Sequence, residues 1–157
     1  MTTTPANPTA PIVVTDLQGG YNGQAVIHGC HMEIAAGEIV VIMGGSGPRK
    51  STFLRHLIGL KEPMTGDVQL FGQSLYGVNE TKRLQLLKGI GVAFQSGALL
   101  SSLTVGQNVA LPMIEHTDLD AEMIDIIVRM KLDFVNLLGK EDLLPSELSG
   151  GMLKRAA

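Results

Sequence analysis

Short apolar runs rich in β-branched residues alternate along this chain with stretches in which apolar residues recur at helical spacing. The apolar runs lie in Ile12–Val14, Val26–Ile34, Ile39–Met43, Asp67–Phe71 and Ile90–Phe94. Four of the five runs are followed directly by a glycine or a polar residue, and Val26–Ile34 is followed by the turn Ala36-Gly37, as expected where strands end. The run Ile39–Met43 contains no polar residue, which predicts a strand that is buried on both faces.

Helical spacing marks the segments between and after these runs. Helices are predicted over Lys50–Leu60, Thr81–Leu87 and Leu119–Leu138. Thr104 is placed to cap a further helix that Pro112 is expected to stop. Gly139 ends the longest repeat, whose apolar face is expected to pack in the core.

Composition narrows the class of protein. The 157 residues are 45% hydrophobic and 17% charged, which is typical of a globular domain with a proper core. The net charge of −3 argues against a nucleic-acid partner. Cys30 is the single cysteine, so no internal disulfide can form, and the four histidines have no metal-ligand spacing, so no role is expected for them. Residues 1–11 are predicted to be a flexible tail, because they are rich in Thr, Pro and Ala.

A bilayer-spanning helix needs about 20 consecutive apolar residues, and no stretch of the sequence approaches this. Any link to a membrane is therefore expected to run through a partner protein.

A glycine-rich turn joins the run Ile39–Met43 to the predicted helix that follows. It reads Gly44, Gly45, Ser46, Gly47, Pro48, Arg49, Lys50, Ser51, Thr52. In a phosphate-binding loop, successive backbone N–H groups converge on phosphate oxygens, a Lys bridges the terminal phosphates and a hydroxyl holds magnesium. We expect Lys50 and Ser51 to take these two roles. The alternative is a turn that only connects a strand to a helix.

Two residues of this turn depart from the pattern G-x-x-x-x-G-K-[ST]. Arg49 stands where the pattern has Gly, and Pro48 precedes it. Proline has no N–H to donate, and Arg49 has a Cβ where close approach of the backbone favours Gly. A lost charge-assisted hydrogen bond is worth about 1.5–3 kcal/mol, or roughly tenfold to over a hundredfold in affinity. The Arg49 guanidinium can recover part of this by contacting phosphate itself, so weakened nucleotide binding is expected.

Three further residues are candidates for a binding site. Gln95 follows the run Ile90–Phe94, Tyr21 follows a Gly-Gly turn, and Ser149 precedes Gly150 and Gly151. A Ser followed by two glycines at a helix start can bind an anion, and Ser149 can equally be a simple N-cap. The plainer alternatives for the other two are a polar residue at a strand end and a turn tyrosine packed on a sheet edge.

A short apolar segment after Gln95 has two possible roles. Leu99, Leu100 and Leu103 can line a groove for a helix of a partner protein, or they can pack in the core.

The order of phosphate loop, Gln95 and Leu148-Ser149-Gly150-Gly151 resembles the ATP-binding subunit of ABC transporters. Longer segments resemble the ATPases of MCE-type or Mla-type (toluene-tolerance) phospholipid transporters. These segments are Arg55–Leu60, Phe94–Val105, Asn108–Pro112, Glu115–Thr117 and Pro145–Met152. The resemblance runs from about Ile12 to Ala157.

This resemblance implies a P-loop NTPase fold of the ABC-cassette type. The α/β fold would comprise an N-terminal antiparallel β subdomain, part of a RecA-like core and a helical subdomain. Residues 12–95 would form the nucleotide-binding core. Residues 96–157 would hold the Q-loop, the helical subdomain and the signature motif.

The resemblance also implies an ATPase that uses ATP and Mg²⁺. The residues implied to bind ATP are Gly44, Gly45, Ser46, Gly47, Pro48, Arg49, Lys50, Ser51, Thr52, Gln95, Ser149, Gly150 and Gly151. Tyr21 would stack on adenine, Ser51 and Gln95 would hold magnesium, and Lys50 and Gln95 would be catalytic. The Ser149 segment would complete the site of a second copy, which implies a homodimer. The implied partner is an integral-membrane permease at the cytoplasmic face of the inner membrane of a Gram-negative bacterium.

A full cassette of this family continues into an apolar strand that ends in Asp-Glu, followed by a switch His. No run of four apolar residues followed by Asp-Glu occurs after Lys50. We therefore expect the C-terminal part of the core, including the catalytic Glu, to be missing.

Three functional interpretations stay open. One is the ATPase subunit of a lipid transporter. Another is a truncated, degenerate cassette with little or no ATPase activity, which only docks on a permease or is a gene remnant. A P-loop phosphotransferase would leave Leu148–Gly151 unexplained.

Overall fold

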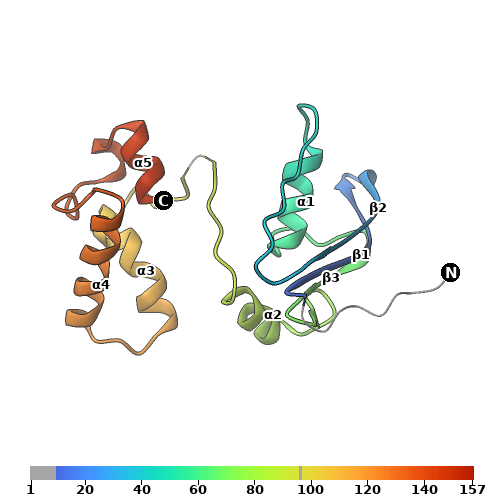
Figure 1. The fold of residues 1–157 in the computed structure, drawn as a ribbon, viewed down its shortest axis with the longest axis horizontal. Helices are drawn as coiled ribbons and strands as arrows, with labels where there is room; N and C mark the ends of the chain where they lie inside the picture. The colour runs from blue at the N-terminus through green and yellow to red at the C-terminus, as the bar shows by residue number, and fades with distance from the viewer. Residues whose placement is uncertain (1–9, 96) are drawn as a thin grey trace. The chain divides into compact units, whose positions relative to one another are not determined.

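A computed structural model describes residues 10–95 and 97–157 of the chain (Figure 1). The chain divides into two compact units, the first ending at Gly91 and the second spanning Val92–Ala157. This division falls slightly before the one predicted after Gln95. Of the predicted tail, residues 1–9 lie outside the described residues. Ala10 is only 4% exposed, and the Pro11 carbonyl accepts a hydrogen bond from the Phe71 N–H at 2.8 Å.

The first unit is built on a four-stranded antiparallel sheet of order β2-β1-β3-β4. Its strands are β1 (Ile12–Tyr21), β2 (Gln24–Ile34), β3 (Thr65–Leu70) and β4 (Gln73–Ser74). Asn22 and Gly23 join β1 to β2 with φ values of 51° and 78°, as a tight hairpin turn requires. The antiparallel β subdomain expected from the sequence is thus formed.

Two helices complete the first unit, α1 (Arg49–Leu57) and α2 (Glu80–Leu87). Phe53 and Leu57 of α1 are buried in one apolar cluster with Leu17 and Val68 of the sheet. The Asn79 side chain caps α2 by accepting a hydrogen bond from the Lys82 N–H at 2.9 Å. The helix α1, which follows the glycine-rich turn, is therefore fixed to the sheet by its apolar face.

Two predicted strands are absent from the part of the chain that the structure describes. Residues 39–43 and 90–94 form irregular chain, and the prediction of a doubly buried strand at Ile39–Met43 is wrong. Ile39, Val41 and Met43 are 91%, 71% and 86% exposed. A strand is stabilised by ladder hydrogen bonds to a neighbour and by covered faces. No described strand pairs with either segment, so their β propensity stays without a ladder.

The second unit is helical, with α3 (Val105–His116), α4 (Ala121–Phe134), the short 3-10 helix η1 (Pro145–Glu147) and α5 (Gly150–Ala156). Thr104 caps α3 as predicted, in a reciprocal pair of hydrogen bonds with Gln107. The prediction that Pro112 stops this helix is wrong. A proline removes a single i→i−4 hydrogen bond, and α3 continues because it packs on α4 through a shared buried cluster.

The predicted helix over Leu119–Leu138 is shorter at both ends. Asp120 caps α4 by accepting a hydrogen bond from the Met123 N–H at 2.8 Å. The chain leaves the helix after Phe134, and Asn136 takes a left-handed φ of 55°. Asn is one of the few residues that tolerate this conformation, which explains the end before Gly139.

Candidate nucleotide-binding site

The glycine-rich turn leads directly into the N-terminus of α1. Pro48 is the N-cap with φ −73°, and no side chain caps this helix end. No acidic residue lies in the first turn. The N–H groups of Arg49, Lys50 and Ser51 therefore have no partner within the helix. Together with the helix dipole they make an end that favours an anion.

Lys50 organises the turn from within. Its Nζ donates hydrogen bonds to the carbonyl oxygens of Gly44 at 2.9 Å and Gly45 at 2.6 Å. An ammonium group has three donors, so one remains for a further acceptor. Gly47 has a φ of 155°, in a range that L side chains rarely adopt. The turn is thus wrapped around a cation at the start of a helix.

The hydroxyl-bearing residues of the turn lie in different environments. Ser46 and Ser51 are exposed, whereas Thr52 is completely buried. The Thr52 Oγ1 donates a hydrogen bond to the phenolic oxygen of Tyr21 at 2.9 Å. The structure therefore joins Tyr21 to the phosphate-loop segment, although 31 residues separate the two in sequence.

Two cationic side chains that the sequence did not point to lie beside Tyr21. Arg55 Nη1 donates to the Tyr21 oxygen at 3.2 Å, and Lys61 Nζ lies 4.3 Å from the ring centroid. The hydrogen bond from Thr52 lowers the pKa of the Tyr21 phenol, and the charges of Arg55 and Lys61 act in the same direction. Arg55 lies three residues after Thr52 on α1, a spacing that places both on one helix face.

Gln95 and the segment after it belong to the second unit. Gln95 is exposed in a turn, in which the Gly97 N–H donates to the Phe94 carbonyl at 3.1 Å. Ser96, between them, lies outside the described residues. Lys50 lies in the first unit and Gln95 in the second.

Asn108 holds the chain that follows Gln95, a role that sequence reasoning missed. Its Oδ1 accepts from the Leu100 N–H at 2.7 Å, and its Nδ2 donates to the carbonyls of Leu103 at 3.1 Å and Thr104 at 2.9 Å. The position of this asparagine in the first turn after the cap residue Thr104 is the only sequence signal for it.

Ser149 is the N-cap of α5, and its Oγ accepts from the Met152 N–H at 3.3 Å. A Cβ added at Gly150 or Gly151 would meet no atom within 4 Å. The first turn of α5 is therefore open. Arg155 fixes the other end of α5 by donating to the Val135 carbonyl at 2.6 Å.

A groove of about 580 Å³ lies in the second unit, between the segment after Gln95 and the helices. Leu99 and Leu100 line it, with Val109 and Pro112 of α3 and Arg155 of α5. Leu103 is not among its lining residues.

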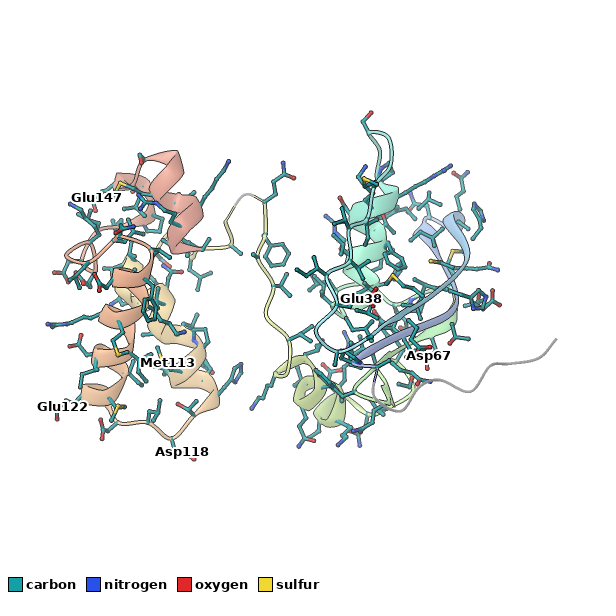
Figure 2. All side chains as sticks on the ribbon, in the orientation of Figure 1. Glu38, Asp67, Met113, Asp118, Glu122 and Glu147 are labelled. Atoms are coloured by element: carbon teal, nitrogen blue, oxygen red, sulfur yellow. The ribbon has the colours of Figure 1, made fainter. Side chains whose placement is uncertain are left out.

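The acidic side chains that the structure describes form no metal site. Of the acidic residues labelled in Figure 2, Asp67 lies on β3, Glu122 on α4 and Glu147 on η1, whereas Glu38 and Asp118 lie in loops. Among residues 10–95 and 97–157, no three His, Cys, Asp or Glu side chains are grouped as metal ligands. The groups available to magnesium among the predicted residues are the Ser51 hydroxyl and the Gln95 amide. In the same ranges, no helix is both long and apolar enough to cross a bilayer.

Comparison with known proteins decides the family. The family model described as ABC transporter matches residues 27–157. This chain belongs to the ABC transporter family. The sequence prediction of the family is confirmed.

The curated relatives are ATP-binding proteins of transport systems, whose names give two kinds of cargo. The chain is 40% identical over 136 residues to the intermembrane phospholipid transport system ATP-binding protein MlaF of Haemophilus influenzae, covering 86% of this chain and 52% of the relative. It is 40% identical to MlaF of Escherichia coli, covering 80% and 47%. A probable ribonucleotide transport ATP-binding protein, mkl of Mycobacterium leprae, is 37% identical, covering 92% and 42%. The chain thus spans about half the length of these relatives.

Solved structures agree on the fold. The dimeric post-hydrolysis structure of the ATP-binding cassette MJ0796, bound to ADP and Pi, matches with a TM-score of 0.82 and 25% identity, covering 92% of this chain and 68% of that one. CbiO1 of Clostridium perfringens, part of the transporter complex cbiONQ, matches with a TM-score of 0.78 and 26% identity, covering 94% and 59%. The ABC-cassette fold expected from the sequence is confirmed.

Proposed function

We propose that this chain binds Mg²⁺-ATP through the turn Gly44–Thr52 and serves the ATPase that drives a phospholipid transporter. The observation that supports this most is the uncapped start of α1, with the Lys50 ammonium held against it by the loop carbonyls. A triphosphate can replace those carbonyls as acceptor for Lys50 while it binds the free amides of the helix start. The likeness to the two MlaF proteins supports the phospholipid cargo.

Each predicted residue has a role in this proposal. Lys50 binds the terminal phosphates, Tyr21 stacks on adenine, and Ser51 and Gln95 hold magnesium. Magnesium would neutralise charge on the phosphates during transfer to water. Ser149, Gly150 and Gly151 would bind the γ-phosphate held by a second copy. The dimeric MJ0796 cassettes support that pairing.

The groove of the second unit is the proposed docking site for an integral-membrane protein. An apolar groove between helices is suited to a partner helix laid into it. Leu100 is 49% exposed and lines this groove. We propose that an integral-membrane permease docks here, which places the protein at the cytoplasmic face of the inner membrane of a Gram-negative bacterium.

A degenerate cassette is the second candidate, and a specific observation favours it. Pro48 occupies the N-cap of α1 and has no N–H, and the Arg49 side chain stands at the first helical position. The helix start therefore offers one amide fewer than a phosphate loop with glycine and serine at these two places. On this reading ATP binds weakly or not at all, and the chain only docks on its permease.

Calorimetric titration with Mg²⁺-ATP separates the two candidates. The natural chain is compared with the double variant Pro48→Ser and Arg49→Gly, and with Lys88→Met as a control for the loss of one exposed positive charge. We expect measurable binding by the natural chain and binding that is about tenfold to a hundredfold tighter in the double variant. Binding by the double variant alone would establish the degenerate cassette. Binding by neither would overturn the proposal.

A further inference from the structure

We propose that Arg55 and Lys61 are positioning residues that hold Tyr21 as a one-sided platform for the base of the nucleotide. Arg55 fixes the ring through its hydroxyl, and Lys61 covers one face, so that the base stacks on the other. This inference rests on the proposed ATP site, of which Tyr21 is the base-binding member.

The hydroxyl of Tyr21 is anchored on α1 at two points. Thr52 Oγ1 and Arg55 Nη1 both donate to it, at 2.9 Å and 3.2 Å. Thr52 is fully buried, so this donor cannot move away with the turn. Both donors lie on the first two turns of the helix that carries Lys50. The distance from the ring to the phosphate loop is therefore set by one rigid helix.

The faces of the ring are not equivalent. Lys61 Nζ lies 4.3 Å from the ring centroid, well inside the range of a cation–π contact. Lys61 is itself held in place, because its carbonyl accepts from His56 Nδ1 at 2.6 Å and from the Tyr76 hydroxyl at 2.7 Å. One face of Tyr21 is thus occupied by a cation whose backbone is fixed, so a flat ligand that stacks on the ring has to use the opposite face.

The tyrosine content of the chain makes the anchoring directly measurable. There are two tyrosines and no tryptophan. Burial raises the pKa of Tyr76 to about 12, whereas the hydrogen bond from Thr52 lowers the pKa of Tyr21. As the pH is raised, the near-ultraviolet absorbance of the phenolates should therefore increase in two separate steps. The step at lower pH belongs to Tyr21. In Arg55→Met the lower step is expected to move to higher pH, because a donor to the phenolate is lost.

The test of the role compares two ligands that share phosphates and differ in the base. Affinities for ATP and for inorganic tripolyphosphate, both with Mg²⁺, are measured for the natural chain, Tyr21→Phe, Arg55→Met, Lys61→Met and the double variant Tyr21→Phe with Arg55→Met. Lys88→Met again controls for charge. The ratio of the two affinities isolates the contribution of the base.

We expect the ratio to fall about threefold to tenfold in each single variant, as for the loss of one hydrogen bond or contact. The double variant should fall no further than Tyr21→Phe, because both changes break the same bond. The inference would be overturned, with the ATP site left intact, if Arg55→Met and Lys61→Met had the same ratio of ATP to tripolyphosphate affinity as Lys88→Met. Additive losses in the double variant would overturn it as well. Failure of the natural chain to bind either ligand would overturn the proposed function and this inference together.

Discussion

A buried histidine holds the end of α1 in the first unit. His56 is 0% exposed, and its Nδ1 lies 2.6 Å from the Lys61 carbonyl, which must accept, so Nδ1 carries the proton. Its Nε2 is buried without a hydrogen-bond partner, beside Gly19, where a Cβ would overlap the ring. Tyr76 donates to the His56 carbonyl at 2.6 Å. A neutral imidazole therefore fits this site, and a charged one does not.

Stability should depend on pH through this side chain. Burial lowers the pKa of His56 below the ordinary value of about 6.5. Between the two values the unfolded chain binds more protons than the folded chain, so stability rises with pH. We expect a lower free energy of unfolding at pH 5.5 than at pH 7.5 in urea melts. His56→Gln should reduce this difference, with the exposed His28→Gln as the matched control. An undiminished difference in His56→Gln would refute the assignment.

His56 also shows which side-chain roles cannot be predicted from the sequence. Lys50, Ser51 and Ser149 could be found from spacing, because their motifs are local. The sequence assigns no role to His56, Arg55 or Lys61, because each has a partner that lies across the fold. Only the packing of α1 on the sheet brings these side chains to Tyr21 and Gly19.

The helix α4 is apolar on two faces, and only one of them is buried. Val128 and Leu132 are 4% and 1% exposed, whereas Met130 and Phe134 are 54% and 78% exposed. Helical periodicity predicted the element but not the buried face. The expectation that the apolar face of the repeat packs in the core is therefore wrong for six of its members, which are 41% to 78% exposed, namely Leu119, Met123, Ile126, Met130, Phe134 and Leu138. The face of α4 that packs on α3 is the buried one, and the apolar pattern of α4 does not specify where α3 lies.

Two substitutions on α4 test this division. Leu132→Ala should lower the free energy of unfolding of the second unit by about 2–5 kcal/mol, because it leaves a cavity in the α3–α4 core. Phe134→Ala should change it by no more than about 0.5 kcal/mol, because the ring lies in solvent. Urea melts followed by circular dichroism measure both. Equal losses in the two variants would show that the other face of α4 is also buried.

At the scale of the whole molecule, the motifs and their order along the chain predicted the fold better than the apolar runs did. The order in which the phosphate loop, Gln95 and Leu148–Gly151 follow one another along the chain predicted the family and the cassette fold. Such motifs are informative because backbone recognition of phosphate restricts residue type and spacing. The apolar runs at 39–43 and 90–94 predicted strands that the structure does not form. A strand depends on a neighbour distant in sequence, and no local pattern specifies that neighbour.

The proposed ATP site depends on main-chain amides at the start of α1, which bind phosphate. Nitrogen–proton correlation spectra of the labelled chain, recorded during a titration with Mg²⁺-ATP, test it most directly. We expect the amide signals of Gly45, Gly47, Lys50 and Ser51 to shift in a saturable way, and the same shifts to be lost or strongly weakened in Lys50→Met. Signals of this turn that stay still at saturating ATP, or that shift equally in Lys50→Met, would contradict the account.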